Sequence, residues 1–381
     1  MLLIPNVNLA IPASRGVLLA VALVLGGCAT VPPPTELLTA PMQVQSIAGA
    51  PPVVDGRAAF RSAFCWTLRE ERVASPDDAA CERWLWRLTD EPAGNADRVV
   101  LPANPERLEI LLVTGAFSEC VGEASRPYSA GAARLRAAGA KVRTLVVGGR
   151  SGTGPNARQI AEALEASPID GGRKVILIGY SKGGLDILRF LVDFPELAAR
   201  VDAVVGVASP VFGTPLAELA EPAYAALVAK MPHGKCPPGD GEVMSSLTPE
   251  AATQWLGANP LPPGVRFYSL AAFTTRGHVA RALLPFWKHL GGTDVRNDGQ
   301  VVATDAVIPG STLLGYANVD HWGVAQTIET EHPMLAARQD TALFPLEQLF
   351  VAMVAFIADD LVQNARSGPG NVPAANREGE R

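Results

Sequence analysis

The fold of this chain is indicated by one stretch, Lys174-Val175-Ile176-Leu177-Ile178-Gly179-Tyr180-Ser181-Lys182-Gly183-Gly184. A run of β-branched residues and leucine ends in Gly-x-Ser-x-Gly, and Leu185 to Leu191 follow with apolar residues at helical spacing. This order of strand, sharp turn and helix is the one that a serine nucleophile elbow requires. Gly179 and Gly183 remove side chains that would clash in the strained turn. The pentapeptide alone is a weak signal, so a base and an acid are needed elsewhere in the chain.

Composition and charge exclude some partners. The 381 residues carry a net charge of −6 and contain no long basic run, so nucleic acid is not an expected partner. The length fits one large domain or two ordinary ones. No Cys-x-x-Cys or His/Cys cluster suggests a metal. No cofactor is implied by the serine-dependent mechanism described below.

The N-terminus has the pattern of an export signal. The apolar run from Gly16 to Gly27 is too short to span a bilayer comfortably, and it ends at Cys28. Leu25-Gly26-Gly27-Cys28 resembles a bacterial lipobox, which implies a signal peptide over residues 1–28 and an acyl anchor on the cysteine. Ala29 then favours, by resemblance, the outer membrane of a two-membraned bacterium. The alternative is an ordinary cleaved signal peptide with an incidental cysteine.

Export affects the interpretation of the remaining cysteines, because disulfides form in oxidising compartments. Cys65, Cys81, Cys120 and Cys236 make an even four, which suggests two disulfides and allows three pairings. We favour a local bond between Cys65 and Cys81, and a second bond that joins Cys120 and Cys236 across distant loops. The alternative is free buried thiols.

Apolar strands and helical patterns alternate through the middle of the chain. This alternation predicts a parallel sheet with helices on both faces, in a domain over residues 59–365. Between about 211 and 263 the alternation breaks, which predicts either an inserted helical cap over the carboxyl edge of the sheet or ordinary packing. The Pro-rich residues 29–58 are expected to form an extended tether, and residues 366–381 a disordered tail. Strands are expected at 108–113, 142–147, 175–178, 201–207 and 265–272, and helices at 128–138, 156–166 and 344–364.

Two late segments supply the acid and the base. Asn297-Asp298-Gly299-Gln300-Val301 resembles the segment that carries the acid in many bacterial lipases, and Ala317-Asn318-Val319-Asp320-His321-Trp322-Gly323 resembles their histidine loop. With the elbow, these segments resemble the serine lipases and esterases of the α/β-hydrolase family, over about residues 108–360. The triad members of that family follow in the order Ser, Asp or Glu, His.

The resemblance implies a triad of Ser181, Asp298 and His321, in which the histidine activates the serine and the aspartate orients the histidine. Asp298 has the alternative of being a plain turn residue. Asp320 adjoins the histidine and is expected to hydrogen-bond loop amides. The remaining competitors for the acid are Asp294 and Asp305.

Of the five histidines, His321 is the one whose position in the sequence fits the catalytic base. His233 lies in the expected cap, while His278 and His289 precede the expected acid and so break the expected order. His332 comes late enough, but its Glu-His-Pro setting lacks a comparable strand end.

An oxyanion hole needs two backbone donors. The resemblance implies one at Lys182, directly after the nucleophile, and one in the loop after the first core strand. Ala116 aligns with that second donor, and Phe117 is the competing choice. Many lipases have His-Gly in this loop, where this chain has Thr114-Gly115.

Two aromatic residues are expected to contact the substrate. Tyr180 precedes the nucleophile, and Phe212 lies in Ser209-Pro210-Val211-Phe212-Gly213-Thr214-Pro215-Leu216. This segment resembles a lipase turn that shapes the wall of the acyl pocket, although a plain strand-ending turn explains it as well.

These features predict a serine hydrolase of carboxylic esters, with lipid or acyl esters as substrates and a lipid anchor in a membrane. An acyltransferase or peptidase on the same fold is the first alternative. The second is a non-catalytic surface lipoprotein that keeps the fold for binding, and the complete set of Ser, Asp and His argues against it. The oligomeric state is left open.

Overall fold

The computed structural model describes residues 34–39, 44–70, 81–92, 100–167, 172–219, 237–328, 333–338 and 343–366. The chain divides into two units, Met1–Val31 and Pro32–Arg381, and all of the described residues belong to the second. The predicted signal peptide, its lipidation site Cys28 and the tail beyond residue 366 lie outside the described residues. Within those residues, no helix combines the length and the apolar character needed to cross a bilayer.

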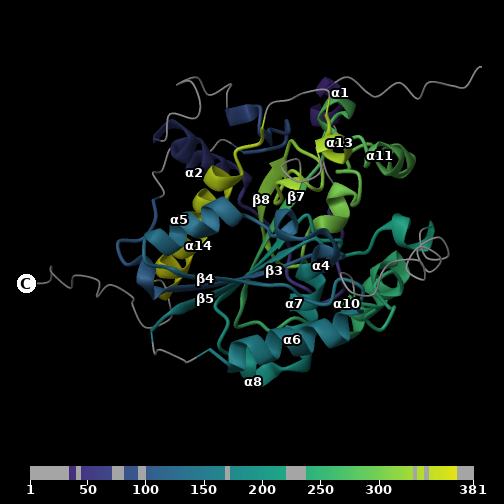
Figure 1. Cartoon of the computed structure of the whole chain (residues 1–381). Coiled ribbons are helices and arrows are strands. Elements are labelled where there is room, and N and C mark those ends of the chain that lie inside the picture. The colour runs from purple at the N-terminus through teal and green to yellow at the C-terminus, as the bar shows by residue number, and fades with distance from the viewer. Residues whose placement is uncertain are drawn as a thin grey trace, which may run out of the picture. The chain divides into compact units, whose positions relative to one another are not determined.

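An eight-stranded sheet forms the centre of the second unit (Figure 1). Its strands are β1 (Val54–Asp55), β2 (Leu85–Trp86), β3 (Leu108–Val113), β4 (Lys141–Leu145), β5 (Lys174–Tyr180), β6 (Ala203–Val207), β7 (Arg266–Ala272) and β8 (Thr312–Ala317). Along the order β1-β8-β7-β6-β5-β3-β4 all neighbours are parallel, and β2 pairs with β8 in the antiparallel direction. The predicted parallel sheet is confirmed, and the five expected strands, observed as β3 to β7, begin and end within a few residues of the prediction.

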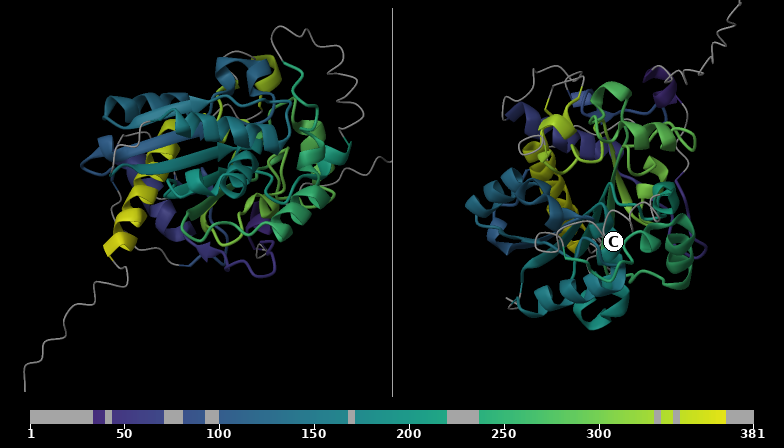
Figure 2. Two further views of the ribbon diagram at one scale, coloured as in Figure 1. Left: turned by 90° about the horizontal axis from the view of Figure 1, so that it is seen from below. Right: turned by 45° about the vertical axis from the view of Figure 1, so that its right-hand side comes forward.

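Helices cover both faces of the sheet, as predicted (Figures 1 and 2). One face carries α2 (Arg57–Glu70), α5 (Ser129–Ala137) and α14 (Leu346–Arg366), and the other carries α6 (Thr153–Glu165), α7 (Lys182–Asp193) and α8 (Pro195–Ala198). Because side chains alternate along a strand, Ile110 and Leu112 pack toward the first group and Leu111 and Val113 toward the second. This is the architecture expected of the α/β-hydrolase fold.

Shorter helices lie in the connections of the sheet. They are α1 (Pro34–Thr39), η1 (Pro105–Arg107), α4 (Ser118–Val121), η2 (Glu123–Ser125), η3 (Ser245–Leu247), α10 (Pro249–Ala258), η4 (Arg276–His278), α11 (Leu284–Leu290), η5 (Ala303–Ala306) and α13 (Pro333–Ala336). Most of them lie at the ends of strands, where loops carry functional residues.

Residues 34–39 and 44–58, the described part of the expected tether over residues 29–58, belong to the folded unit. Strand β1 adds to the edge of the sheet, with Val54 opposite Thr312 of β8. The Gln45 side chain donates a hydrogen bond to Asp305, 260 residues away. Proline content predicts an extended segment, but it does not show that this segment finds a sheet edge to pair with.

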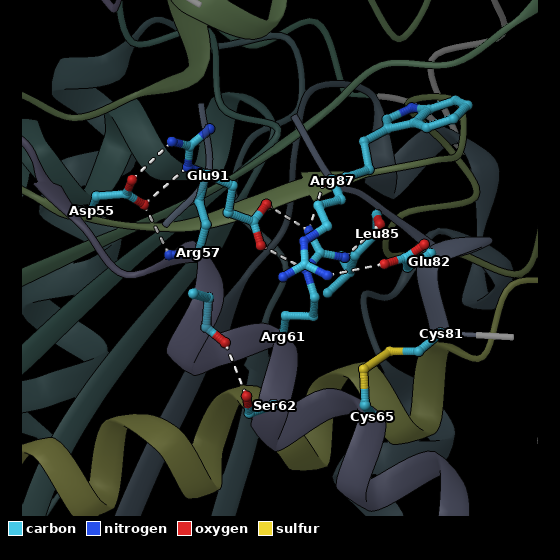
Figure 3. Close-up of polar contacts among 12 residues, drawn as sticks. Asp55, Arg57, Arg61, Ser62, Cys65, Cys81, Glu82, Leu85, Arg87 and Glu91 are labelled. Atoms are coloured by element: carbon cyan, nitrogen blue, oxygen red, sulfur yellow. Dashed lines mark hydrogen bonds and ion pairs between the residues drawn. A yellow bond between two sulfur atoms is a disulfide. The ribbon is translucent and has the colours of Figure 1, made fainter. Parts of the chain in front are cut away.

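The buried Arg61 and a disulfide attach α2 to strand β2 and the residues around it (Figure 3). Arg61 donates to both carboxylate oxygens of Glu91 at 2.7 Å, and to the carbonyls of Leu85 and Trp86 at 2.7 Å. The predicted bond between Cys65 and Cys81 is confirmed, with 5.4 Å between the Cα atoms.

Strand β2 also supports the loop that follows β8. The Asn318 backbone N–H donates to the Trp84 carbonyl at 2.8 Å, and its side-chain amide donates to the Arg83 carbonyl at 2.9 Å. Asn318 lies three residues before His321. The predicted histidine loop is therefore bonded to residues near the start of the folded unit.

The connection from β6 to β7 contains the predicted cap at about 211–263, of which residues 220–236 lie outside the described residues. Its described part packs against the loop after β3 and the first turns of α7. The residues of this apolar cluster are Ala116, Phe117, Leu185, Ala217, Val243, Met244 and Leu247. Cys120, at the end of the same loop, is disulfide-bonded, and its expected partner Cys236 lies outside the described residues, so that pairing stays a prediction.

Candidate active site

Ser181 lies in a strained turn between β5 and α7. Its backbone angles are φ 53° and ψ −131°, a region that residues with a side chain rarely adopt. A Cβ added at Gly179 would lie 2.4 Å from the backbone of Gly184, and one at Gly183 would lie 2.5 Å from the carbonyl oxygen of Val113. The two glycines of the motif therefore allow a close approach of backbone, as the sequence predicts.

The three residues of the predicted triad lie in one hydrogen-bonded series. The Nε2 atom of His321 is 2.9 Å from the Ser181 Oγ, and the Nδ1 atom is 2.8 Å from an Asp298 carboxylate oxygen. With the Nδ1 proton donated to the carboxylate, Nε2 is left to accept the serine proton. This arrangement can convert the hydroxyl into a nucleophile.

A tight turn holds Asp298 in place. Its Oδ1 atom accepts the backbone N–H groups of Gln300 at 2.8 Å and Val301 at 2.7 Å, which leaves Oδ2 for His321. Gly299, with φ 94°, allows this turn. The Asp298 carbonyl also accepts the His321 backbone N–H at 2.8 Å, so the acid and the base are bonded twice.

The competing carboxylates have other partners. Asp294 accepts the backbone N–H of Arg296 at 2.8 Å and pairs with its guanidinium. Asp305 is hydrogen bonded by Gln45. Neither carboxylate is bonded to His321 in the described part of the chain.

Asp320 supports the histidine loop instead. Its buried carboxylate accepts the backbone N–H groups of Gly323 at 2.8 Å and Ala280 at 2.6 Å. The Arg338 guanidinium reaches both oxygens, at 2.9 and 3.0 Å. The prediction that Asp320 hydrogen-bonds loop amides is confirmed.

The two other described histidines, His278 and His289, are not bonded in this series. His289 is exposed on α11, and His278 ends the short helix η4. His233 and His332 lie outside the described residues. In the described ranges, no group of three or more His, Cys, Asp or Glu side chains could hold a metal ion.

Backbone amides near Ser181 differ in their availability. The Phe117 N–H donates to the Gly149 carbonyl at 3.0 Å. Among the described residues, the amides of Ala116 and Lys182 have no backbone acceptor. Of the two candidates in the loop after β3, Ala116 is therefore the one with an N–H group that could bind an oxyanion.

Both predicted substrate contacts are buried in the structure. The Tyr180 hydroxyl donates to the His321 carbonyl at 2.8 Å, and burial, reinforced by Asp298 and Asp320, raises its pKa well above the usual value. Phe212 is 2% exposed and packs in the core on the α6 and α7 face. In this structure Tyr180 therefore supports the histidine loop, and Phe212 packs in the core. Contact of either residue with a substrate stays a prediction.

The Lys182 side chain makes a buried contact that was not predicted from the sequence. It is 1% exposed, and its Nζ lies 2.5 Å from an oxygen of the buried Asp186. A lysine and an aspartate four residues apart on a helix commonly pair, which is the signal that could have found this contact.

The chain is similar to solved structures of ester hydrolases. It is 32% identical to the metagenomic carboxyl esterase MGS0156, covering 86% of this chain and 98% of that one, with a TM-score of 0.75. It is 22% identical to the mature Bacillus licheniformis lipase BlEst2 over 63% of this chain and 96% of that one, with a TM-score of 0.48. No protein-family model and no curated protein sequence match it. The first similarity extends over nearly all of the esterase.

Proposed function

The chain belongs to the carboxyl esterases of the α/β-hydrolase fold, and from this premise we propose that it hydrolyses carboxylic esters through an acyl-enzyme on Ser181. One observation carries the proposal: the hydrogen-bonded series from the Ser181 hydroxyl through His321 to Asp298. These three side chains come from separate segments of the chain, and each is bonded to the next at 2.8 or 2.9 Å.

The first half of the reaction forms the acyl-enzyme. The Ser181 Oγ attacks the ester carbonyl carbon while His321 Nε2 takes its proton, and the carbonyl electron pair moves to the oxygen. Asp298 holds the imidazolium in place. The tetrahedral intermediate then collapses, the bond to the alcohol oxygen breaks, and His321 returns the proton to the departing alcohol.

The second half releases the acid. Water replaces the alcohol and attacks the acyl carbon, and His321 again takes the proton. When this second intermediate collapses, the bond to the Ser181 Oγ breaks and the serine recovers its proton. The products are one carboxylic acid and one alcohol, and His321 ends in its starting state.

The negative oxygen of both intermediates is assigned to the backbone amides of Ala116 and Lys182. The assignment is supported by the engagement of Phe117 with Gly149, which leaves Ala116 as the available donor in its loop. A donor of this kind typically contributes about 10²- to 10³-fold in rate.

An acyl ester, with lipid esters included, is the substrate class that we propose. The support is the apolar cluster in which Val243 and Leu247 of the insertion pack against Ala116 and Phe117. Apolar side chains at this position favour an acyl chain over a charged or strongly polar group.

Fluorophosphonate labelling and p-nitrophenyl esters from acetate to palmitate test this function. Ser181→Ala should abolish labelling and lower kcat by about 10⁶-fold, because serine and histidine act as one unit. Ser129→Ala, which changes an exposed serine on α5, should keep both. Ester turnover that does not depend on Ser181 would refute the proposal. Transfer of the acyl group to an added alcohol in preference to water would replace the esterase by an acyltransferase.

We also propose that the protein is exported and anchored by acyl chains on Cys28, in the outer membrane of a two-membraned bacterium. The support is the lipobox-like Leu25-Gly26-Gly27-Cys28, together with the Cys65–Cys81 disulfide, a bond typical of oxidising compartments. Cys28→Ser should move the protein from the membrane to the soluble fraction of the cells. Membrane retention equal to that of the wild type would exclude the anchor.

A further inference from the structure

A buried ion pair lies beside the nucleophile. Lys182 directly follows Ser181, and its Nζ is 2.5 Å from the Asp186 Oδ1 with both side chains buried. A buried pair adds little to stability unless its remaining hydrogen-bonding groups are satisfied. Its position at the residue that supplies an oxyanion donor suggests a role in the geometry of that donor.

Asn156 of α6 satisfies the other oxygen of the aspartate. Its side-chain nitrogen donates to the Asp186 Oδ2 at 2.8 Å and to the Gly148 carbonyl at 3.1 Å. Among the described residues, the Asn156 carbonyl oxygen has no hydrogen-bond partner, so this buried side chain acts only as a donor. It connects the start of α7 to the loop at residues 148–151.

The same loop holds the segment of the second oxyanion donor. The Gly149 carbonyl accepts the Phe117 N–H at 3.0 Å, and the Gly149 N–H donates to the Glu119 carboxylate at 3.0 Å. A Cβ added at Gly149 would lie 2.6 Å from the Phe117 nitrogen, so this approach requires glycine. Because Phe117 directly follows Ala116, the loop also orients the Ala116 amide.

We propose that Asn156 is a positioning residue that couples the two halves of the oxyanion hole through the loop at 148–151. The inference rests on the proposed function, because it uses the Ala116 and Lys182 amides as donors. A displacement of the loop would move both amides relative to Ser181. Donors fixed in advance stabilise the developing negative charge, and a misplacement of about 1 Å can cost about 10²-fold in rate.

Asn156→Leu tests the coupling, because leucine has the same number and branching of side-chain heavy atoms as asparagine but donates no hydrogen bond. We expect kcat for p-nitrophenyl butyrate to fall by about 10- to 100-fold with KM unchanged. Affinity for an alkyl trifluoromethyl ketone, whose adduct with Ser181 places an oxyanion in the hole, should fall by a similar factor. Wild-type kcat and ketone affinity in this variant would overturn the proposal.

Gly149→Ala disturbs the contact between the loop and Phe117, and it tests the proposal even if Asn156→Leu does not fold. The added methyl group should displace the Phe117 amide and give the same loss of kcat and ketone affinity. In the double variant the two losses should be less than additive, because both act through one loop. Fully additive losses would mean two independent supports and would reject the coupling.

Ile160→Ala is the matched control for general loosening of α6. Ile160 is buried four residues further along the helix and packs in the core on that face of the sheet. The variant should melt at a lower temperature while kcat and ketone affinity stay at wild-type values. An equal loss of ketone affinity in Ile160→Ala would overturn the specific role of Asn156.

The proposed function and this inference fail separately. If hydrolysis persists in Ser181→Ala, the function itself is wrong. If hydrolysis depends on Ser181 and Asn156→Leu is unaffected, only the coupling is wrong.

Discussion

The turn at Ser181 and the N-terminal flank, residues 44–70 and 81–92, are stabilised by different kinds of contact. At the turn, backbone atoms approach so closely that glycine is required, and a motif of five residues shows this. In the flank, Arg57 and Arg61 reach Asp90 and Glu91, 33 and 30 residues further along. A close approach within a turn can be recognised from a local sequence motif, whereas pairing between residues far apart in the sequence cannot. In the proposed function the chemistry depends on the first region, and we expect the stability to depend on both.

The largest expected effect is that of Asp298→Asn, which should change the activity at Ser181 but not the stability. The amide keeps the size of the carboxylate but cannot hold His321 in the tautomer that accepts the serine proton. We expect kcat for p-nitrophenyl butyrate to fall by about 10⁴-fold, with little change in melting temperature. Asp294→Asn, four residues before, should retain activity, and the opposite result would reassign the acid.

Arg61→Met, in the flank, is expected to lower the stability of the fold instead of the activity. The Glu91 side chain is fully buried against Arg61, so its charge would be left without a partner. We expect the free energy of unfolding in urea to fall by about 3–5 kcal/mol. Arg87→Met breaks a pair with 47% and 44% exposed side chains and should change it by less than about 1 kcal/mol. Equal losses in the two variants would remove the special role of the buried pair.

Gly179→Ala measures how much the close backbone contacts of the turn contribute to stability. The new methyl group would overlap backbone atoms of Gly184, and we expect a loss of about 3 kcal/mol together with lower activity. Gly257→Ala on α10 has open space around the added atom and should be neutral or slightly stabilising. The two thermal unfolding curves measure the difference, and a neutral Gly179→Ala would mean that the turn relaxes.

The smallest effect is a change in pH dependence on replacing Asp186. Burial raises the pKa of this carboxyl to about 6, against the opposing effects of Lys182 and Asn156. The folded state therefore holds the proton where the unfolded chain has lost it, and this contribution to stability disappears as the pH rises through about 6. In Asp186→Asn, the free energy of unfolding relative to wild type should rise between about pH 4 and 7. The measurement is urea unfolding of both proteins at several pH values. If the pKa of Asp186 were not raised, the difference in the free energy of unfolding between variant and wild type would not change with pH.

Much of the fold and of the candidate site could be predicted from the sequence, because both depend on local patterns. The long strands show as apolar runs, and Ser181, Asp298 and His321 each lie in a short motif at a strand end. Strands β1 and β2 could not be found, because each has two residues and pairs with β8 more than two hundred residues away.

The surroundings of Tyr180 and Phe212 could not be predicted from the sequence, for a different reason. Both residues adjoin the site in sequence, but the twist and register of the sheet decide on which side an aromatic ring lies. Burial, which the one-dimensional pattern does not contain, then makes Tyr180 a support for His321 and Phe212 a core residue.

The bonds between Asn318 and the carbonyls of Arg83 and Trp84 affect the order in which the molecule is completed. These partners are about 235 residues apart. During translation, Arg83 and Trp84 therefore cannot form these bonds until most of the folded unit has been synthesised. Contacts of such separation form late in folding. On dilution from urea, we expect ester hydrolysis to return more slowly than the far-ultraviolet helical signal. Recovery of both at one rate would show that the histidine loop forms without its early partner.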